Sequence, residues 1–297
     1  MSTLTITTIQ ANLTWEDKEA NLQHLQKKID SIAEKTEIVV LPEMFNTGFS
    51  MRAKELAETM EGETVEWMKM VSNKNGIILT GSLMIKEGDK YFNRLVWMLP
   101  NGQYGYYDKR HLFAYAEEDK HFDRGNKRLI ASVKGWKINL LVCYDLRFPV
   151  WARQHPDRIS TSLDADQEPL DSARDSTAAF DSAQEPKSAP LNSTPAEYDV
   201  LIYVANWPER RSHAWKTLLC ARAIENQCYV VGVNRVGDDG KNIHYSGNSL
   251  VIDPLGQVLY HMAEEEDVNT ITLSKEKLEE TRTKYPFLND ADDFTIL

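Results

Sequence analysis

Cysteine is scarce in this chain, because its 297 residues include only Cys143, Cys220 and Cys228. A small, odd number of cysteines in a long chain argues against a disulfide framework and is typical of a reducing compartment. Long apolar runs are also missing, since none approaches the roughly 20 residues that a membrane span needs. The opening residues, MSTLTITTIQ, lack the basic and then hydrophobic segments of a secretory signal. We therefore expect a cytoplasmic protein with no membrane partner.

Positive charge is in deficit. The chain has 34 Lys and Arg against 45 Asp and Glu, which gives a net charge of -11. Binding to nucleic acid requires clustered Lys and Arg that face the phosphates, so no nucleic-acid partner is expected. The deficit is uneven along the chain, because residues 159–197 alone carry eight acidic and two basic side chains.

The same acidic stretch has little apolar character. It is crowded with Ser, Ala, Asp, Thr and Pro, and its one aromatic residue is Phe180. Ordering about 40 such residues costs about 1 to 2 kcal/mol each, and there is little apolar surface to offset that cost. We expect a single domain over residues 1–297 that contains a flexible surface insertion at 159–197. An inert loop is favoured over a partner-binding segment.

Strand-like and helix-like segments alternate through the rest of the chain. Periodicity predicts helices at 15–35 and 213–227. It predicts strands at 4–10, 37–43, 76–85, 92–99, 199–206, 228–234 and 268–273. Helices that repeatedly separate strands predict an α/β domain of layered sheets and helices.

A thiol stands at the end of one further predicted strand. The run INLLVCYDLRFP, residues 138–149, leads an apolar strand to Cys143 and then breaks before Pro149, which suits the first position of a helix. A cysteine among apolar neighbours is inert, whereas one at a strand-to-helix turn can meet backbone N–H groups and a base that favour the thiolate. The run alone favours a core cysteine, so the chemical interpretation depends on partners elsewhere.

Three other segments supply such partners. Glu43 ends the apolar run IVVLP, Lys109 follows the aromatic stretch YGYYD, and Glu117 and Glu118 lie in AEEDKHF. Each residue alone is typical of a solvated surface. Together they provide what amide hydrolysis by the Cys143 thiol needs: a base that later acts as acid, and a cation for the oxyanion.

These segments resemble the motifs of the nitrilase superfamily, the carbon–nitrogen hydrolases. LPEMFNTGF (41–49) is similar to its glutamate motif, YDKRHLF (107–113) to its lysine motif and VCYDLRFP (142–149) to its cysteine motif. ANWP (205–208) and HAWKTLLCARAIENQ (213–227) continue a likeness that covers essentially the whole chain except the insertion. The resemblance implies a four-layer α-β-β-α sandwich, a homodimer, and a reaction that needs no metal and no organic cofactor.

The resemblance also assigns roles to single residues. The catalytic triad of the superfamily falls on Glu43, Lys109 and Cys143. Its supporting glutamate stands four residues before an aromatic residue, and this spacing favours Glu118 over Glu117.

The substrate class follows from the same resemblance, which is strongest to the omega-amidase branch. That branch hydrolyses the terminal amide of 2-oxo dicarboxylic monoamides such as 2-oxoglutaramate or 2-oxosuccinamate. The backbone N–H of Tyr144 is expected to assist Lys109 at the oxyanion, and Arg147 to pair with the distal carboxylate unless it forms a structural salt bridge. Trp207 and Phe113 are candidate pocket walls, with core packing as the alternative.

Other functions are open from the sequence. A nitrile, an N-carbamoyl compound or another linear amide is the nearest alternative substrate, because the same three catalytic residues serve all of them. A non-catalytic scaffold that uses the insertion as a docking arm is a second alternative. The presence of Glu43, Lys109 and Cys143 together argues against a scaffold.

Overall fold

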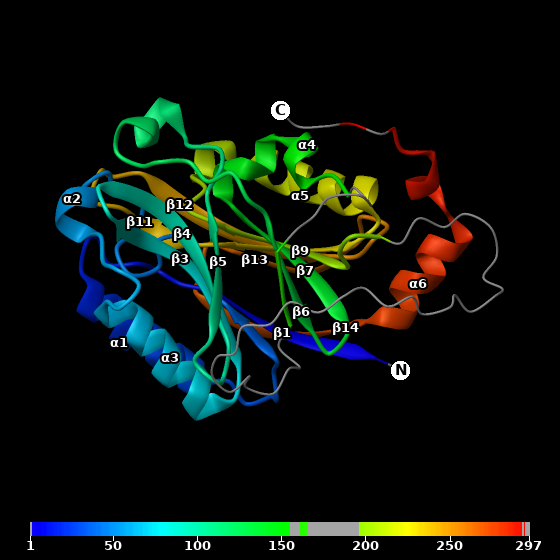
Figure 1. Cartoon of the computed structure of the whole chain (residues 1–297), viewed down its shortest axis with the longest axis horizontal. Helices are drawn as coiled ribbons and strands as arrows, with labels where there is room; N and C mark the ends of the chain where they lie inside the picture. The colour runs from blue at the N-terminus through cyan, green and yellow to red at the C-terminus, as the bar shows by residue number, and fades with distance from the viewer. Residues whose placement is uncertain (1, 155–160, 165–195, 293, 295–297) are drawn as a thin grey trace, which may run out of the picture.

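In the computed structural model, the protein has two β-sheets that pack face to face, with helices on their outer faces (Figure 1). The structure describes residues 2–154, 161–164, 196–292 and 294. In Figure 1, α1 (Lys18–Asp30) and α3 (Glu63–Asn75) lie below the sheets, and α4 (Pro149–Ala152) and α5 (Ser212–Asn226) lie above them. This is the four-layer α-β-β-α arrangement that the resemblance implied.

The first sheet has six strands in the order β14-β1-β2-β3-β4-β5. They are β14 (Asp267–Ser274), β1 (Thr3–Gln10), β2 (Ile38–Val40), β3 (Ile78–Glu87), β4 (Lys90–Met98) and β5 (Tyr104–Asp108). Successive side chains of a strand point to opposite faces. In β2, Ile38 and Val40 join the core between the sheets, while Val39 and the following Leu41 join the core beneath α1 and α3. The uniformly apolar sequence of β2 therefore reflects cover on both faces.

The second sheet has eight strands in the order β11-β12-β10-β9-β7-β6-β8, with β13 paired to β12. They are β6 (Leu129–Val133), β7 (Trp136–Val142), β8 (Thr161–Asp164), β9 (Val200–Ala205), β10 (Tyr229–Asn234), β11 (Val236–Asp238), β12 (His244–Ile252) and β13 (Val258–Ala263). The central strands β7, β9 and β10 are parallel. The helix α5 packs on β10 and β12, and Trp215, Leu219 and Ala223 from this helix are buried in the main core.

Short helices complete the described chain. The helix α4 begins with Pro149, as the sequence predicted. The remaining helices are α2 (Ala53–Leu56), α6 (Lys275–Lys284) and the 3-10 turns η1 (Ala114–Ala116), η2 (Glu118–Lys120), η3 (Cys143–Arg147), η4 (Glu209–Arg211) and η5 (Phe287–Asp290). Three of these turns, η2, η3 and η4, carry residues of the candidate site.

A short part of the predicted insertion at 159–197 is described in the structure. Thr161–Asp164 form β8, which lies parallel to β6 with Leu129 opposite Thr161. The pairing places β8 at the edge of the second sheet, beside β6. Residues 159–160 and 165–195 of the predicted flexible insertion lie outside the described residues.

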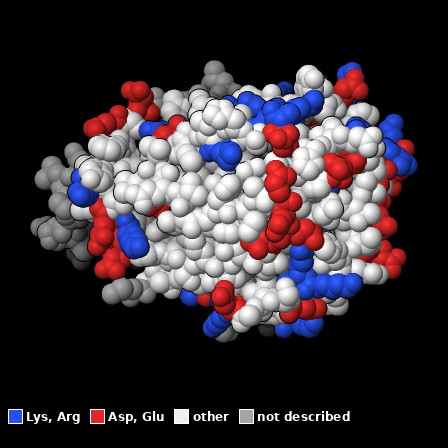
Figure 2. Space-filling model, turned by 180° about the vertical axis from the view of Figure 1, so that it is seen from behind, with Lys and Arg blue, Asp and Glu red and all other residues white. Residues whose placement is uncertain are grey.

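None of the helices in the described residues is both long enough and apolar enough to cross a membrane. Figure 2 shows one face of the molecule, on which Lys and Arg side chains lie beside Asp and Glu around a largely uncharged middle. The described part of that face has no continuous basic patch of the kind that nucleic-acid binding requires.

Candidate active site

Four of the predicted residues meet where strands of both sheets end. Glu43 follows β2, Lys109 follows β5 directly, Cys143 follows β7 directly, and Glu118 opens η2. The side chains of Glu43, Lys109 and Glu118 are completely buried, and Cys143 is 8% exposed. Residues 100 positions apart in the sequence therefore share one buried site.

The ammonium group of Lys109 holds the two carboxylates together. Its Nζ lies 2.9 Å from Oε1 of Glu43, and 3.0 and 2.9 Å from Oε1 and Oε2 of Glu118. Glu117 instead lies at the surface, where Lys120 donates to it at 2.6 Å. The geometry thus places Glu118, the residue that the spacing favoured, in the buried cluster.

Amide groups fix both carboxylates in place. The side-chain Nδ2 of Asn93 donates to Glu43 at 2.8 Å and to Glu118 at 3.2 Å. The backbone N–H of Asn206 donates to Oε2 of Glu43 at 2.8 Å, and that of Phe113 donates to Oε2 of Glu118 at 2.6 Å. Every oxygen of these two buried carboxylates accepts a hydrogen bond, as burial of charge requires.

Cys143 occupies a sharp turn between β7 and η3. Its φ is +44°, in the left-handed region that a residue with a Cβ seldom adopts. The Sγ atom lies 3.9 Å from the backbone oxygen of Asn206. The turn ends the strand and leaves the thiol at the wall of a cavity.

Burial and charge set the proton affinities of the cluster. Burial raises the pKa of the Cys143 thiol well above its ordinary value, Glu43 raises it further, and the positive charge of Lys109 opposes this rise. Burial alone lowers the pKa of Lys109, but the carboxylates of Glu118 and Glu43 outweigh it, so the net pKa is raised. Burial also raises the pKa of Glu118, with Lys109 opposing. The resting site therefore holds an ammonium ion beside a protonated thiol.

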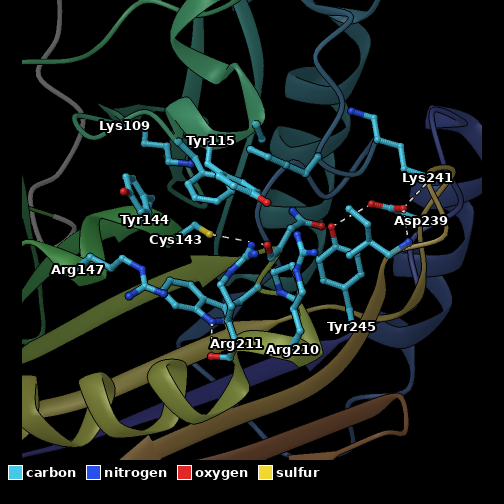
Figure 3. A pocket seen from close by; sticks show the side chains of 17 residues that line it. Lys109, Tyr115, Cys143, Tyr144, Arg147, Arg210, Arg211, Asp239, Lys241 and Tyr245 are labelled. Atoms are coloured by element: carbon cyan, nitrogen blue, oxygen red, sulfur yellow. Dashed lines mark hydrogen bonds between the residues drawn. The ribbon is translucent and has the colours of Figure 1, made fainter.

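A cavity of about 220 Å³ opens onto Cys143 and Lys109. All four predicted substrate-binding residues line it, namely Phe113, Tyr144, Arg147 and Trp207. Figure 3 shows Cys143 between Tyr144 and Arg147 on one side and Arg210, Arg211 and Tyr245 on the other. Phe113 and Tyr144 contact each other, with ring centroids 4.9 Å apart.

The family model described as carbon-nitrogen hydrolase matches residues 5–157 and 191–283. The chain belongs to the carbon–nitrogen hydrolase family. It is 38% identical to the omega-amidase YafV of Yersinia enterocolitica and to that of Escherichia coli K12, in both cases over all of this chain and all of the relative. It is 28% identical to a 2-oxoglutaramate amidase of Bacillus subtilis, over 96% of each chain.

Solved structures of the family support the fold. XC1258 from Xanthomonas campestris, described as a CN-hydrolase superfamily protein with an arsenic adduct in its active site, is 38% identical over the whole of both chains, with a TM-score of 0.86. Nit3 of Saccharomyces cerevisiae, a member of branch 10 of the nitrilase superfamily, has the same fold at 24% identity, with a TM-score of 0.74 over 96% of this chain and 94% of that one. The prediction of a nitrilase-type sandwich is therefore confirmed, and the protein is a hydrolase that acts on amides.

Sequence reasoning missed several residues of this hydrolase's site. Asn93 is a polar residue at a buried position of β4, directly before the apolar end of that strand, and a buried polar side chain calls for hydrogen-bond partners. Asn206 was noticed only as part of the ANWP motif. The pocket residues Arg211, Asp239 and Tyr245 carried no signal, because loops distant in the sequence bring them together.

Proposed function

We propose that this carbon–nitrogen hydrolase is an omega-amidase. It hydrolyses the terminal amide of a 2-oxo dicarboxylic monoamide, such as 2-oxoglutaramate or 2-oxosuccinamate, to the acid and ammonia. The observation that carries the proposal is the buried cluster of Lys109 with two carboxylates beside Cys143, at the wall of a pocket rich in guanidinium groups. The names of the relatives at 38% and 28% identity support the substrate class.

The first half of the reaction forms a thioester. Glu43 accepts the proton of Cys143, and the sulfur attacks the amide carbon of the substrate. The oxyanion that develops is stabilised by Lys109 and by the backbone N–H of Tyr144. When the intermediate collapses, the carbon–nitrogen bond breaks, and Glu43 returns the proton to the leaving nitrogen as ammonia departs.

The second half releases the acid. Glu43 takes a proton from water, and the hydroxide attacks the thioester carbon. The carbon–sulfur bond then breaks, and Cys143 regains its proton from Glu43. Glu118 accepts two hydrogen bonds from Lys109 throughout and holds the ammonium in place. These steps use only groups of the protein and water, so activity is expected to survive dialysis against a chelator.

The far end of the substrate is expected to lie against Arg147, Trp207 and Phe113. Arg147 forms no salt bridge among the described residues, and its guanidinium lies 4.9 Å from the ring centroid of Trp207. The alternative of a structural ion pair for Arg147 therefore gains no support. An unpaired guanidinium on an aromatic wall suits a substrate carboxylate.

A panel of amides tests the proposed function. Ammonia release is expected to be fast from 2-oxoglutaramate and much slower from glutamine, a simple nitrile or an N-carbamoyl amino acid. Comparable turnover of all four would overturn the omega-amidase assignment. The Cys143→Ala variant is expected to lose at least about 10³-fold in kcat while its circular dichroism spectrum is unchanged. An active Cys143→Ala variant would exclude the thiol mechanism.

The organisation of the protein completes the proposal. We expect residues 1–297 to form one domain interrupted by the insertion, and two protomers to associate so that their layers continue into each other. Cys143, Cys220 and Cys228 are all unpaired, which supports a cytoplasmic location. Sedimentation velocity tests the homodimer, and cell fractionation tests the location.

A further inference from the structure

We infer that Arg211, rather than Arg147, is the principal partner of the substrate carboxylate. This inference rests on the proposed function and names the residue that selects an anionic substrate. Arg211 is the last residue of η4 and lines the same cavity as Cys143 (Figure 3).

The backbone and side chain of Arg211 are both fixed by aromatic residues of the pocket. The indole Nε1 of Trp207 donates to the backbone oxygen of Arg211 at 2.8 Å. The guanidinium carbon lies 5.1 Å from the ring centroid of Phe113. A guanidinium held on an aromatic ring has its orientation set before a ligand arrives, which lowers the entropy cost of binding.

The guanidinium of Arg211 has no carboxylate partner among the described residues. Asp239 is the only acidic residue described in the pocket lining, and its own loop uses it. Oδ1 of Asp239 accepts from the backbone N–H groups of Lys241 and Ile243 at 2.8 and 2.9 Å, and Oδ2 accepts from the hydroxyl of Tyr245 at 3.0 Å. The N–H donors of Arg211 are therefore available for a bound carboxylate.

Apart from Lys109, which the two carboxylates hold, burial distinguishes Arg211 from the other cations of the pocket wall. Arg147, Arg210 and Lys241 are exposed, whereas Arg211 is half-buried. An ion pair is stronger where water is displaced, and exposed pairs contribute little. A carboxylate that reaches into the cavity is therefore held more strongly by Arg211 than by the exposed cations.

Neighbouring cations act on the guanidinium of Arg211. Burial lowers the pKa of Arg211, Arg210 and Arg147 lower it further, and a Cys143 thiolate opposes the fall. Positive charges therefore repel one another in the pocket, and a bound carboxylate relieves this repulsion. An amino acid substrate carries an ammonium next to its carboxylate and would restore that repulsion, so the site favours a 2-oxo acid over its 2-amino counterpart.

Steady-state kinetics with two matched substrates tests the inference. The compound 4-oxopentanamide retains the ketone and the terminal amide of 2-oxoglutaramate but replaces the carboxylate with a methyl group. We expect Arg211→Ala to raise KM for 2-oxoglutaramate by about 10- to 100-fold, the range for loss of a hydrogen-bonded charge partner. Its kcat/KM for 4-oxopentanamide is expected to stay within about threefold of wild type, because that substrate has no carboxylate to lose.

Two further variants sharpen the result. Arg147→Ala is expected to raise KM for 2-oxoglutaramate less than Arg211→Ala does. Lys216→Ala removes one positive charge from the exposed face of α5, outside the pocket, and serves as the charge-matched control. A larger effect of Arg147→Ala, or an equal loss on both substrates for Arg211→Ala, would overturn the assignment.

A binding measurement separates this inference from the proposed function. The Cys143→Ala protein is titrated calorimetrically with 2-oxoglutarate, with and without Arg211→Ala. If 2-oxoglutaramate is not hydrolysed by wild type but Arg211→Ala still weakens 2-oxoglutarate binding about 10-fold or more, the omega-amidase proposal fails and the anion site stands. If hydrolysis is normal but Arg211→Ala changes neither KM nor the Kd of 2-oxoglutarate, the inference fails and the function stands.

Discussion

The Cys143 thiol is held between two opposing charges. Glu43 raises its pKa and Lys109 lowers it, while burial raises it more than either neighbour does. Cysteine nucleophiles that rest as thiolates lie in electropositive and partly exposed sites, which differs from this buried site. In the proposed mechanism the proton of Cys143 therefore leaves during attack, and Glu43 accepts it.

Single substitutions of Glu43 and of Lys109 are expected to move the pKa of Cys143 in opposite directions. Glu43→Gln removes a negative charge and should lower the pKa, whereas Lys109→Met removes a positive charge and should raise it further. Both variants should lose hydrolysis. The shift in the pKa of Cys143 is measured from the ultraviolet absorbance of the thiolate. The titration runs from pH 6 to about pH 11, so it passes the ordinary thiol pKa of about 8.5. A shift of the Cys143 pKa in the same direction in both variants would show that charge does not control this thiol.

Single residues also show what the sequence was able to predict of the site. Glu43, Lys109 and Cys143 were predicted together, because each follows an apolar or aromatic run in a motif and has a side chain suited to one step of the chemistry. Arg211 was not predicted, because its proposed role depends on the exposure and charge of neighbours brought in by other loops. Packing in three dimensions, which local sequence does not encode, makes it the least exposed arginine of the pocket lining.

At the scale of secondary-structure elements, Asp145 links the turn of Cys143 by hydrogen bonds to the segment that carries Lys109. Oδ2 of Asp145 accepts from the backbone N–H of Val142 at 3.1 Å and from the hydroxyl of Tyr107 at 2.8 Å. Oδ1 accepts from the backbone N–H and from Nδ1 of His111, at 3.0 and 2.7 Å. One buried carboxylate thus links the end of β7 with the residues on both sides of Lys109.

Asp145→Asn is expected to loosen this link without changing the size of the side chain. One of the two oxygens becomes an NH₂ group that faces donors, so two hydrogen bonds are lost and buried donors are left unpaired. We expect a loss of about 2 to 4 kcal/mol in the free energy of unfolding and a fall in kcat that exceeds any rise in KM. Urea unfolding and steady-state kinetics measure both.

The surface variant Asp30→Asn is the control for Asp145→Asn. Asp30 is exposed and pairs with Lys74 at 3.4 Å, so its loss should change stability by about 0.5 kcal/mol or less. If Asp145→Asn had as small an effect on stability and kcat as Asp30→Asn, the link between the two segments would not matter to the site.

Strands differed in how well the sequence predicted them. The interior strands β2, β9 and β10 consist mostly of buried apolar residues, β7 is apolar except for Lys137 and Asn139, and all four were predicted. The strands β5, β6, β8 and β11 were missed, and three of them, β5, β8 and β11, lie at the end of a sheet. Position in the sheet is only part of the cause, because the interior strand β6 was missed and the edge strand β14 was predicted. An edge strand is held mainly by backbone hydrogen bonds to one neighbour, which leave little trace in the order of side chains.

Across the whole molecule, the two described segments that flank the insertion lie next to each other. The side chain of Gln154, the last described residue before it, accepts from the backbone N–H of Tyr198 at 3.1 Å and donates to the backbone oxygen of Tyr198 at 3.0 Å. Arg128 donates to Glu197 beside this pair. The family match stops at residue 157 and resumes at 191. The two described segments on either side of this gap are therefore in direct contact.

Shortening the insertion is expected to leave catalysis intact. In one variant residues 165–195 are replaced by a short Gly-Ser linker, which keeps β8. In a second, residues 159–195 are removed, which also deletes β8 and leaves a few residues to connect Gln154 to Tyr198.

Because Gln154 and Tyr198 are already in contact, a short connection spans them without strain, and loop length changes the closure entropy only logarithmically. Both variants should keep kcat/KM for 2-oxoglutaramate within about threefold of wild type, since no residue described in the pocket lining falls in the deleted range.

The second variant should unfold at a lower urea concentration than the first, because it exposes the edge of β6. Sedimentation velocity then reports whether either deletion changes the association of protomers, and loss of activity in both variants would show that the insertion contributes to the active site.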